Sequence, residues 1–387
     1  MKGLAVRLLL LVAGLVVALG LAEALAPLLL PRRACGGRLP FWRPDRAAGW
    51  ALVPGMQAEA VVCAGERELA RHPIEINALG QRDRPRSLAR APSMPRVLVL
   101  GDSFVEALQV DLSETFAARL ERDLGVEVLN AGVSGYATDN ELRAFVSRGR
   151  RYRPDAVLLL FHIGNDVLEN GARLYAGNVR GLPPKPWLRA RGRSPGLAAC
   201  LAAHRAAGRM VAGTPLWLWS HSRVVRFGFT DGLMETLAAA CRPWLGSAPP
   251  RLEDVYGEPR TAAWREAWTT TEALLGRLKA RVGRSGARFA VALGPAGLEY
   301  DPTMRLDWLH PGPGPPRDFE YPYRRLGALL DRDRIRWISL LPALRAHHEA
   351  TGRAGCYAWD GHWDPEGHAV VAAALRGLVG ELAADGR

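Results

Sequence analysis

Short apolar runs alternate with longer stretches of helical spacing over most of the chain. The clearest run, Val97–Leu100, is bounded by Arg96 and Gly101, which is typical of a strand buried in a parallel sheet. Similar runs predict four more strands, at Val126–Leu129, Ala156–Phe161, Arg288–Leu293 and Ile335–Leu340. Helical spacing predicts helices at Thr115–Leu124, Asp139–Arg150, Trp264–Val282, Tyr323–Asp331 and Gly367–Leu382. This alternation predicts a three-layer α/β/α sandwich around a mostly parallel five-stranded sheet.

Two regions depart from this alternation. Residues 34–95 are rich in proline, arginine and glycine, and they predict a lead-in with short strands. Strand character is found at Ala60–Cys63 and Ile74–Ile76, and residues 84–95 predict a loop. The main domain then covers residues 96–387 and contains an insertion at about 171–260.

The insertion is basic and carries several tryptophans. From Gly171 to Thr230 it holds ten Lys or Arg residues and no Asp or Glu, together with Trp187, Trp217 and Trp219. One interpretation is a surface that meets anionic lipid or an acidic glycan. The other is a helical lid with core tryptophans and solvated arginines.

Residues 1–33 predict a membrane anchor. The apolar run from Leu8 to Leu30 is 23 residues long, and its only charge is Glu23. A helix of this length can cross a hydrocarbon core of about 30 Å. A cleaved signal peptide is the competing interpretation, with Ala22-Glu23-Ala24 or Ala24-Leu25-Ala26 as the cleavage box. Pro27 directly follows the second of these boxes, and the apolar run continues beyond it. We therefore expect an N-terminal transmembrane helix, although the arginines after the run leave its orientation open.

Composition excludes several classes of protein. The chain has 387 residues and is 48% hydrophobic, which is too apolar for a disordered chain. The net charge of +12 is compatible with nucleic acid, but no nucleic-acid-binding motif accompanies it and we expect no such partner. None of the five cysteines forms a C-x-x-C pair, so neither a metal site nor a cofactor is predicted. Their odd number leaves at least one thiol outside any disulfide.

Three polar blocks follow the first three strands of the predicted sheet. They are Gly101-Asp102-Ser103-Phe104, the glycine-containing stretch Asn130–Gly135, and Gly164-Asn165-Asp166. Because sites in open α/β sheets form beyond the carboxyl ends of the strands, we expect these blocks to meet there. A serine at a helix start, a close-packed glycine turn and an asparagine amide are what a nucleophile and an oxyanion hole require. Helix caps and an ordinary turn are the alternative interpretations.

A fourth block, Asp360–His368, precedes the last predicted helix. It places a histidine, His362, beside a carboxylate, Asp360. Serine nucleophiles need this pair, because the histidine accepts the hydroxyl proton and the carboxylate fixes the histidine tautomer.

Taken together, the four blocks in this order resemble the SGNH hydrolase superfamily, also called GDSL-like hydrolases, over roughly residues 72–385. The segment Ile76–Arg82 resembles the approach to the serine block in membrane-anchored members. The resemblance implies a flavodoxin-like fold, Ser103 as nucleophile and oxyanion donor, and His362 and Asp360 as base and orienting acid. It also implies Gly135 and Asn165 as further oxyanion donors. The block Asp360-Gly361-His362-Trp363 is similar to the form found in polysaccharide O-acetyltransferase relatives, whereas Phe104 replaces the usual leucine.

We therefore expect a serine-dependent esterase or deacetylase that acts on an acyl or acetyl ester. The expected location is the inner membrane, with the catalytic domain in the periplasm or outside the cell and an envelope glycan or lipid as substrate. An O-acyltransferase of an envelope polysaccharide would use the same residues. A non-catalytic membrane-tethered glycan-binding protein is the alternative from another class.

Other candidate motifs are weaker. Gly192–Gly196 fits the G-x-S-x-G pattern, but no strand precedes it. His347-His348-Glu349 lacks partner ligands for a metal and predicts an exposed helix face. His368 is expected to pack or to cap the last helix, and His162 either lines the pocket or is an ordinary core histidine.

Overall fold

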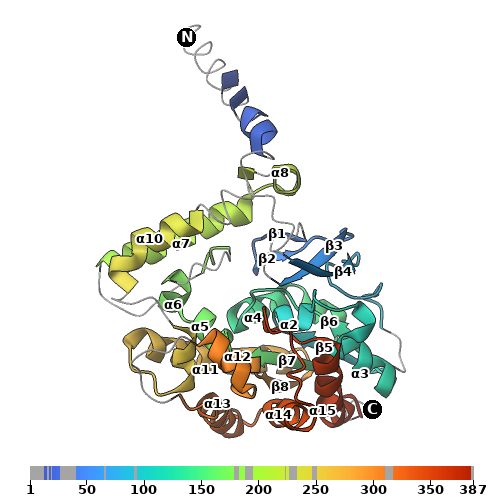
Figure 1. Cartoon of the computed structure of the whole chain (residues 1–387). Helices are drawn as coiled ribbons and strands as arrows, with labels where there is room; N and C mark the ends of the chain where they lie inside the picture. Colours follow the sequence, from blue (N-terminus) through green and yellow to red (C-terminus); the bar gives the residue numbers. More distant parts are fainter. Residues whose placement is uncertain are drawn as a thin grey trace.

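The computed structural model describes residues 13–14, 17–18, 20–26, 41–64, 67–90, 94–177, 183–187, 195–222, 224–225, 233–245, 251–309 and 317–384. The predicted anchor lies largely outside these residues, and its described positions are helical. In Figure 1 this N-terminal helix projects away from the α/β body, next to α8 (Leu216–His221).

The central sheet has five strands in the order β6-β5-β7-β8-β9, and each neighbouring pair is parallel. The strands are β5 (Arg96–Leu100), β6 (Glu127–Asn130), β7 (Ala156–His162), β8 (Arg288–Gly294) and β9 (Arg336–Ser339). Every residue of β5 and β7 is buried, which explains their continuous apolar sequences. The predicted five-stranded parallel α/β sheet is therefore confirmed.

Helices cover both faces of this sheet. On one face α15 (Pro365–Ala384) packs on α3 (Phe116–Leu124) and against β5 and β7. On the other face α11 (Ala262–Gly283) packs on α4 (Thr138–Ser147) and β8, and α13 (Tyr321–Arg332) packs on β9. The chain reverses its direction of travel across the sheet after β6, so the crevice between β5 and β7 is the topological switch point.

Helix α15 is the one helix of the described residues that is long and apolar enough to cross a membrane. Its residues Val371, Leu375, Val379 and Leu382 are buried in the main hydrophobic core. Its apolar character is therefore accounted for by packing in the α/β body.

The lead-in consists of two small antiparallel pairs. Strand β1 (Trp42–Asp45) pairs with β2 (Gly49–Leu52), and β3 (Gln57–Ala64) pairs with β4 (Arg67–Glu75). The β3–β4 pair lies where strand character was predicted, whereas the β1–β2 pair was not predicted. In the insertion, α6 (Ala172–Gly177), α7 (Pro195–Gly213) and α10 (Leu233–Leu245) pack together, and α8 contacts β1. A disulfide between Cys200 and Cys241 joins α7 to α10, and Cys356 is a buried free thiol.

Shorter helices complete the described chain. They are α2 (Ser103–Glu106), α5 (Asp166–Asn170), α12 (Pro302–Trp308) and α14 (Leu341–Thr351), with 3-10 turns at Leu112–Glu114, Gly149–Tyr152, Leu252–Tyr256 and Gly297–Glu299. The helix predicted over Asp139–Arg150 thus ends at Ser147 and continues as a 3-10 turn.

Candidate active site

Ser103 is the first residue of α2, directly beyond the carboxyl end of β5. Asp102 precedes it as the N-cap, and the Asp102 Oδ1 atom accepts a hydrogen bond from the Phe104 N–H at 2.9 Å. The Ser103 N–H donates no hydrogen bond within the described part of the chain. This backbone donor is therefore available beside the serine hydroxyl.

His362 and Asp360 come together at this serine. The His362 Nε2 atom lies 2.7 Å from Ser103 Oγ, across 259 positions of sequence. On the other side of the ring, Nδ1 lies 3.2 Å from Asp360 Oδ2. The Asp360 carboxylate also accepts a hydrogen bond from the His362 N–H at 3.0 Å. Serine, histidine and aspartate thus form one continuous chain of polar contacts.

The loop that carries this pair is held closed at its base. An antiparallel bridge joins Cys356 to Trp363, and the Tyr357 N–H donates to the His362 carbonyl at 2.9 Å. Gly361 lies at a φ of +77°, a backbone conformation that favours glycine. Because the chain reverses at this glycine, Asp360 and His362 lie on the same side of the loop although only two positions separate them.

The environment of His362 favours the protonated imidazole. Burial lowers the pKa of His362, but the adjacent Asp360 carboxylate opposes burial, and so do the charges of Asp102 and Glu106. The result is a pKa raised above the ordinary value of 6.5. A carboxylate that stabilises the imidazolium in this way strengthens a neighbouring general base.

The glycine block lies against α2. A Cβ atom on Gly132 would approach the Glu106 backbone nitrogen to 2.4 Å, so only glycine fits there. The Ser134 hydroxyl and N–H both donate to the buried Glu106 carboxylate. Gly135 follows at a φ of +75°, and its N–H donates no hydrogen bond to any described residue. A second uncommitted backbone donor is therefore held by this block.

Asn165 follows β7 across the switch point from Ser103. Its Nδ2 atom donates to Asp102 Oδ2 at 3.1 Å, and its Oδ1 atom lies 2.8 Å from His162 Nδ1. Although Asn165 is the N-cap of α5, its side chain makes no capping hydrogen bond. The amide is thus directed toward the serine block and not toward its own helix.

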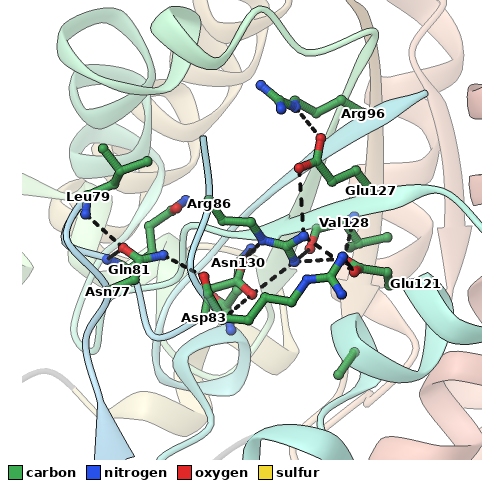
Figure 2. Close-up of polar contacts among 12 residues, drawn as sticks. Asn77, Leu79, Gln81, Asp83, Arg86, Arg96, Glu121, Glu127, Val128 and Asn130 are labelled. Carbon is green, nitrogen blue, oxygen red and sulfur yellow. Dashed lines mark hydrogen bonds and ion pairs between the residues drawn. The ribbon is translucent and has the colours of Figure 1, made fainter. Parts of the chain in front are cut away.

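The segment between β4 and β5 contacts the first residue of the glycine block, Asn130, as Figure 2 shows. Asp83 Oδ2 accepts from the Asn130 N–H at 3.1 Å, and Arg86 pairs with both Asp83 and Glu121. Within the segment, Asn77 Oδ1 accepts two backbone hydrogen bonds that fold the turn before Arg82. This explains why the Ile76–Arg82 approach accompanies the serine block in the sequence.

The remaining candidates lie elsewhere. His368 is buried on α15, and its Nδ1 accepts from the Phe116 N–H at 3.3 Å, so it packs as expected. His347 and His348 lie on α14, and the positions 192–194 of the G-x-S-x-G stretch are outside the described residues. The sequence analysis did not predict that Asp102 contacts Asn165 or that Glu106 contacts Ser134. The positions of these two carboxylates, on either side of Ser103 in the sequence, were the available signal for these contacts.

No protein-family model and no curated protein matches the chain. Several solved structures are similar to parts of this chain. TesA is 15% identical, with a TM-score of 0.37, and the match covers 74% of this chain and 99% of that chain. A GDSL-like lipase from Bacteroides thetaiotaomicron is 10% identical, with a TM-score of 0.36 and coverage of 76% and 91%. An acetylxylan esterase from Geobacillus stearothermophilus, solved as a catalytic mutant, is 13% identical, with a TM-score of 0.38 and coverage of 74% and 95%.

The matched structures include GDSL-type lipases and esterases.

Proposed function

We propose that this protein is a serine-dependent ester hydrolase with Ser103 as its nucleophile. One observation carries the proposal. Ser103 Oγ lies 2.7 Å from His362 Nε2, and Asp360 Oδ2 lies 3.2 Å from the opposite ring nitrogen. A nucleophile and a base in contact, with the base oriented by a third group, is the arrangement that covalent acyl transfer needs.

The reaction would proceed in two steps. Ser103 Oγ attacks the ester carbonyl while His362 Nε2 takes its proton, and the oxyanion forms beside the backbone N–H groups of Ser103 and Gly135 and the Asn165 amide. Collapse of this intermediate expels the alcohol, which takes the proton from His362, and leaves an acyl-enzyme on Ser103. Water, activated by His362, then releases the acid and restores the serine.

A small acyl group on a large alcohol fits the exposure of the site. The side chains of His362 and Asp360 are 22% and 30% exposed, and neighbouring Trp359 is 37% exposed. Because these groups lie close to the surface, they can contact an acetyl ester on a polymer while the rest of the polymer stays outside the site. We therefore propose acetylated envelope glycans as substrates. Good turnover of soluble short-chain esters combined with none of any acetylated polymer would contradict this choice.

We also propose that residues 1–33 anchor the enzyme and that the catalytic domain is exported. The support is the apolar run, whose only charge is Glu23, and the contacts that this charge makes. Glu23 Oε1 accepts hydrogen bonds from the Val224 N–H at 3.1 Å and from the Ser222 hydroxyl, both of which follow α8. Carbonate extraction of membranes and protease accessibility in intact spheroplasts test the two parts. Release by carbonate would refute the anchor, and protection from external protease would refute export.

The direct test of the nucleophile uses the full chain in detergent with a fluorophosphonate probe and p-nitrophenyl acetate, beside Ser103→Ala. We expect labelling and turnover in the wild type and neither in the variant, with an unchanged melting temperature. A folded wild-type protein that is neither labelled nor active would overturn the proposal and favour a glycan-binding role for the same crevice.

An O-acyltransferase is the second candidate, favoured by the block Asp360-Gly361-His362-Trp363 and by the exposed site. It would form the same acyl-enzyme and pass the acyl group to a sugar hydroxyl. Mass spectrometry of a reaction containing glycan oligosaccharides distinguishes the two. Acylated oligosaccharide in excess of free acid would indicate the transferase.

A further inference from the structure

His162, the last residue of β7, lies between two groups of the proposed site. Its Nδ1 atom is 2.8 Å from Asn165 Oδ1, and its ring stacks on Phe104 with centroids 3.9 Å apart and planes 21° from parallel. The residue is only 6% exposed. A Cβ atom on Gly164 would lie 2.7 Å from the His162 ring, so the glycine lets the ring fold back over Asn165.

The orientation of the Asn165 amide follows from its other neighbour. Asp102 is a carboxylate and can only accept, so the end of the amide that faces it must be the Nδ2 donor. The Oδ1 end therefore faces His162, and a stable contact there requires a proton on Nδ1. A proton on Nε2, toward the Pro295 carbonyl, would instead set the Nδ1 lone pair against Oδ1.

The burial of the ring favours its neutral form, which carries a single N–H. Burial lowers the pKa of His162, against the opposing effects of Asp102 and Asn165, and this favours the neutral ring with a single N–H. With that hydrogen on Nδ1, Nε2 is bare. The Pro295 backbone also favours the charged ring, but Nε2 forms no hydrogen bond of ordinary geometry with any residue that the structure describes.

We propose that His162 is a positioning residue, which together with Asp102 fixes the Asn165 amide so that its second Nδ2 hydrogen is presented to the oxyanion. The inference rests on the proposed function, because it concerns the same oxyanion hole. His162 donates to Oδ1 and Asp102 accepts from one Nδ2 hydrogen, so the amide cannot rotate without losing both bonds. A hydrogen bond accepted by Oδ1 also polarises the amide and strengthens its N–H donors.

The test measures steady-state hydrolysis of p-nitrophenyl acetate by the full chain. His162→Leu removes the donor, whereas His162→Asn keeps an N–H near the position of Nδ1. We expect His162→Leu to lower kcat about tenfold or more with KM within about twofold, since removing an oxyanion donor outright costs about 10²–10³ in kcat. We expect His162→Asn to recover most of that loss.

A double-mutant cycle separates positioning from a general structural effect. In an Asn165→Ala background, His162→Leu should cause no further loss, because the group on which it acts is gone. The acid limb of the pH–rate profile should not move, because it belongs to His362. A full additional loss in the Asn165→Ala background, or a His162→Asn variant as slow as His162→Leu, would overturn the inference.

Folding is checked by thermal melting of each variant. If His162→Leu does not fold, His162→Gln replaces it, because its amide reaches the place of Nε2 and leaves Oδ1 without a donor. Equal rates for the Gln and Asn variants would then refute the inference, and a faster Asn variant would support it. Activity that survives Ser103→Ala would refute the proposed function itself, whereas a normal Ser103→Ala result with additive His162 losses would refute only the role of His162.

Discussion

Asp360 and Asp364 lie four positions apart on either side of His362, but they make different contacts. Asp360 Oδ2 lies beside the His362 ring. Asp364 Oδ1 instead accepts from the Glu366 and Gly367 N–H groups, each at 2.9 Å, and so caps α15. One carboxylate is therefore placed to orient the base, and the other to start a helix.

Replacing each aspartate separates these roles. Asp360→Asn should lower kcat for p-nitrophenyl acetate by about 10³–10⁴, because an amide stabilises the wrong tautomer of the base. Asp364→Asn should keep kcat within a few-fold and lower the free energy of unfolding by no more than about 1 kcal/mol, since asparagine also caps helices. Kinetics and urea unfolding of both variants check this. A severe kinetic loss in Asp364→Asn alone would mean that the orienting acid is misassigned.

The raised pKa of His362 predicts the pH dependence of catalysis. The base must be neutral to accept the serine proton, so kcat/KM should rise with pH and reach half its maximum above the ordinary value of 6.5. In Asp360→Asn the residual activity should show this midpoint at lower pH, because the main group that raises the pKa is gone. A pH–rate profile of each protein measures both midpoints, and identical midpoints would contradict the assignment.

The meeting of Ser103, Asn165 and the glycine block at one edge was predictable, because parallel strands bring their carboxyl ends together. The contact of His162 with Asn165 was not, since it depends on which end of an amide faces Asp102. Sequence spacing carries no information about such a rotation. The position of His162 three residues before Asn165 left a lining role and a core role equally open.

Helix α2 is a single turn and depends on a buried arginine at its end. The Arg82 guanidinium donates to the carbonyls of Glu106, Ala107 and Val110, and Ala107 itself is in the left-handed region with a φ of 54°. The Glu106 and Val110 carbonyls accept no other hydrogen bond from the described residues, so they would otherwise be left without partners. The segment before β5 thus stabilises the helix that begins with Ser103.

Arg82→Met should therefore lower the free energy of unfolding by about 3 kcal/mol, because it leaves buried carbonyls unsatisfied. It should also reduce kcat, since α2 begins with the proposed nucleophile, Ser103. Arg84→Met is the matched control. Its side chain is 58% exposed and pairs with Glu121 at the surface, so we expect less than about 1 kcal/mol. Urea unfolding distinguishes the two, and equal losses would contradict a special role for Arg82.

Strands and helices of the α/β body were predicted well because their apolar runs are long and their periods are clear. The β1–β2 pair was missed because Trp42-Arg43-Pro44-Asp45 shows neither an apolar run nor alternation. It is stabilised by tertiary contacts instead. Trp50 Nε1 donates to the Ser134 carbonyl at 3.0 Å, and the Tyr136 hydroxyl donates to the Trp50 carbonyl at 2.5 Å.

The molecule as a whole combines the α/β body with a helical insertion closed by its own crosslink. Cys200 and Cys241 are 41 positions apart, and a loop of this length is stabilised by about 4 kcal/mol in the chain-entropy account of disulfides. The main hydrophobic core draws most of its residues from the sheet and from helices such as α3, α11 and α15, and neither α7 nor α10 contributes to it. Local stability in the insertion should therefore depend on the disulfide more than stability of the body does.

Cys200→Ser/Cys241→Ser should increase hydrogen exchange in α7 and α10 and leave exchange in α11 unchanged. Turnover of p-nitrophenyl acetate should stay within about twofold of wild type, since neither helix contributes a residue to the proposed site. Hydrogen-exchange mass spectrometry with α11 as the internal control measures this. Faster exchange throughout the body would show that the insertion is part of the same cooperative unit.

The 259 positions between Ser103 and His362 have a consequence for biosynthesis. Chains are made from the N-terminus, so Ser103 emerges from the ribosome well before Asp360 and His362. Under the proposed function, a nascent chain that lacks the Asp360–His362 loop would hold the serine without its base and would not cleave esters. We therefore expect activity to begin only after this loop has been made and has folded onto α2.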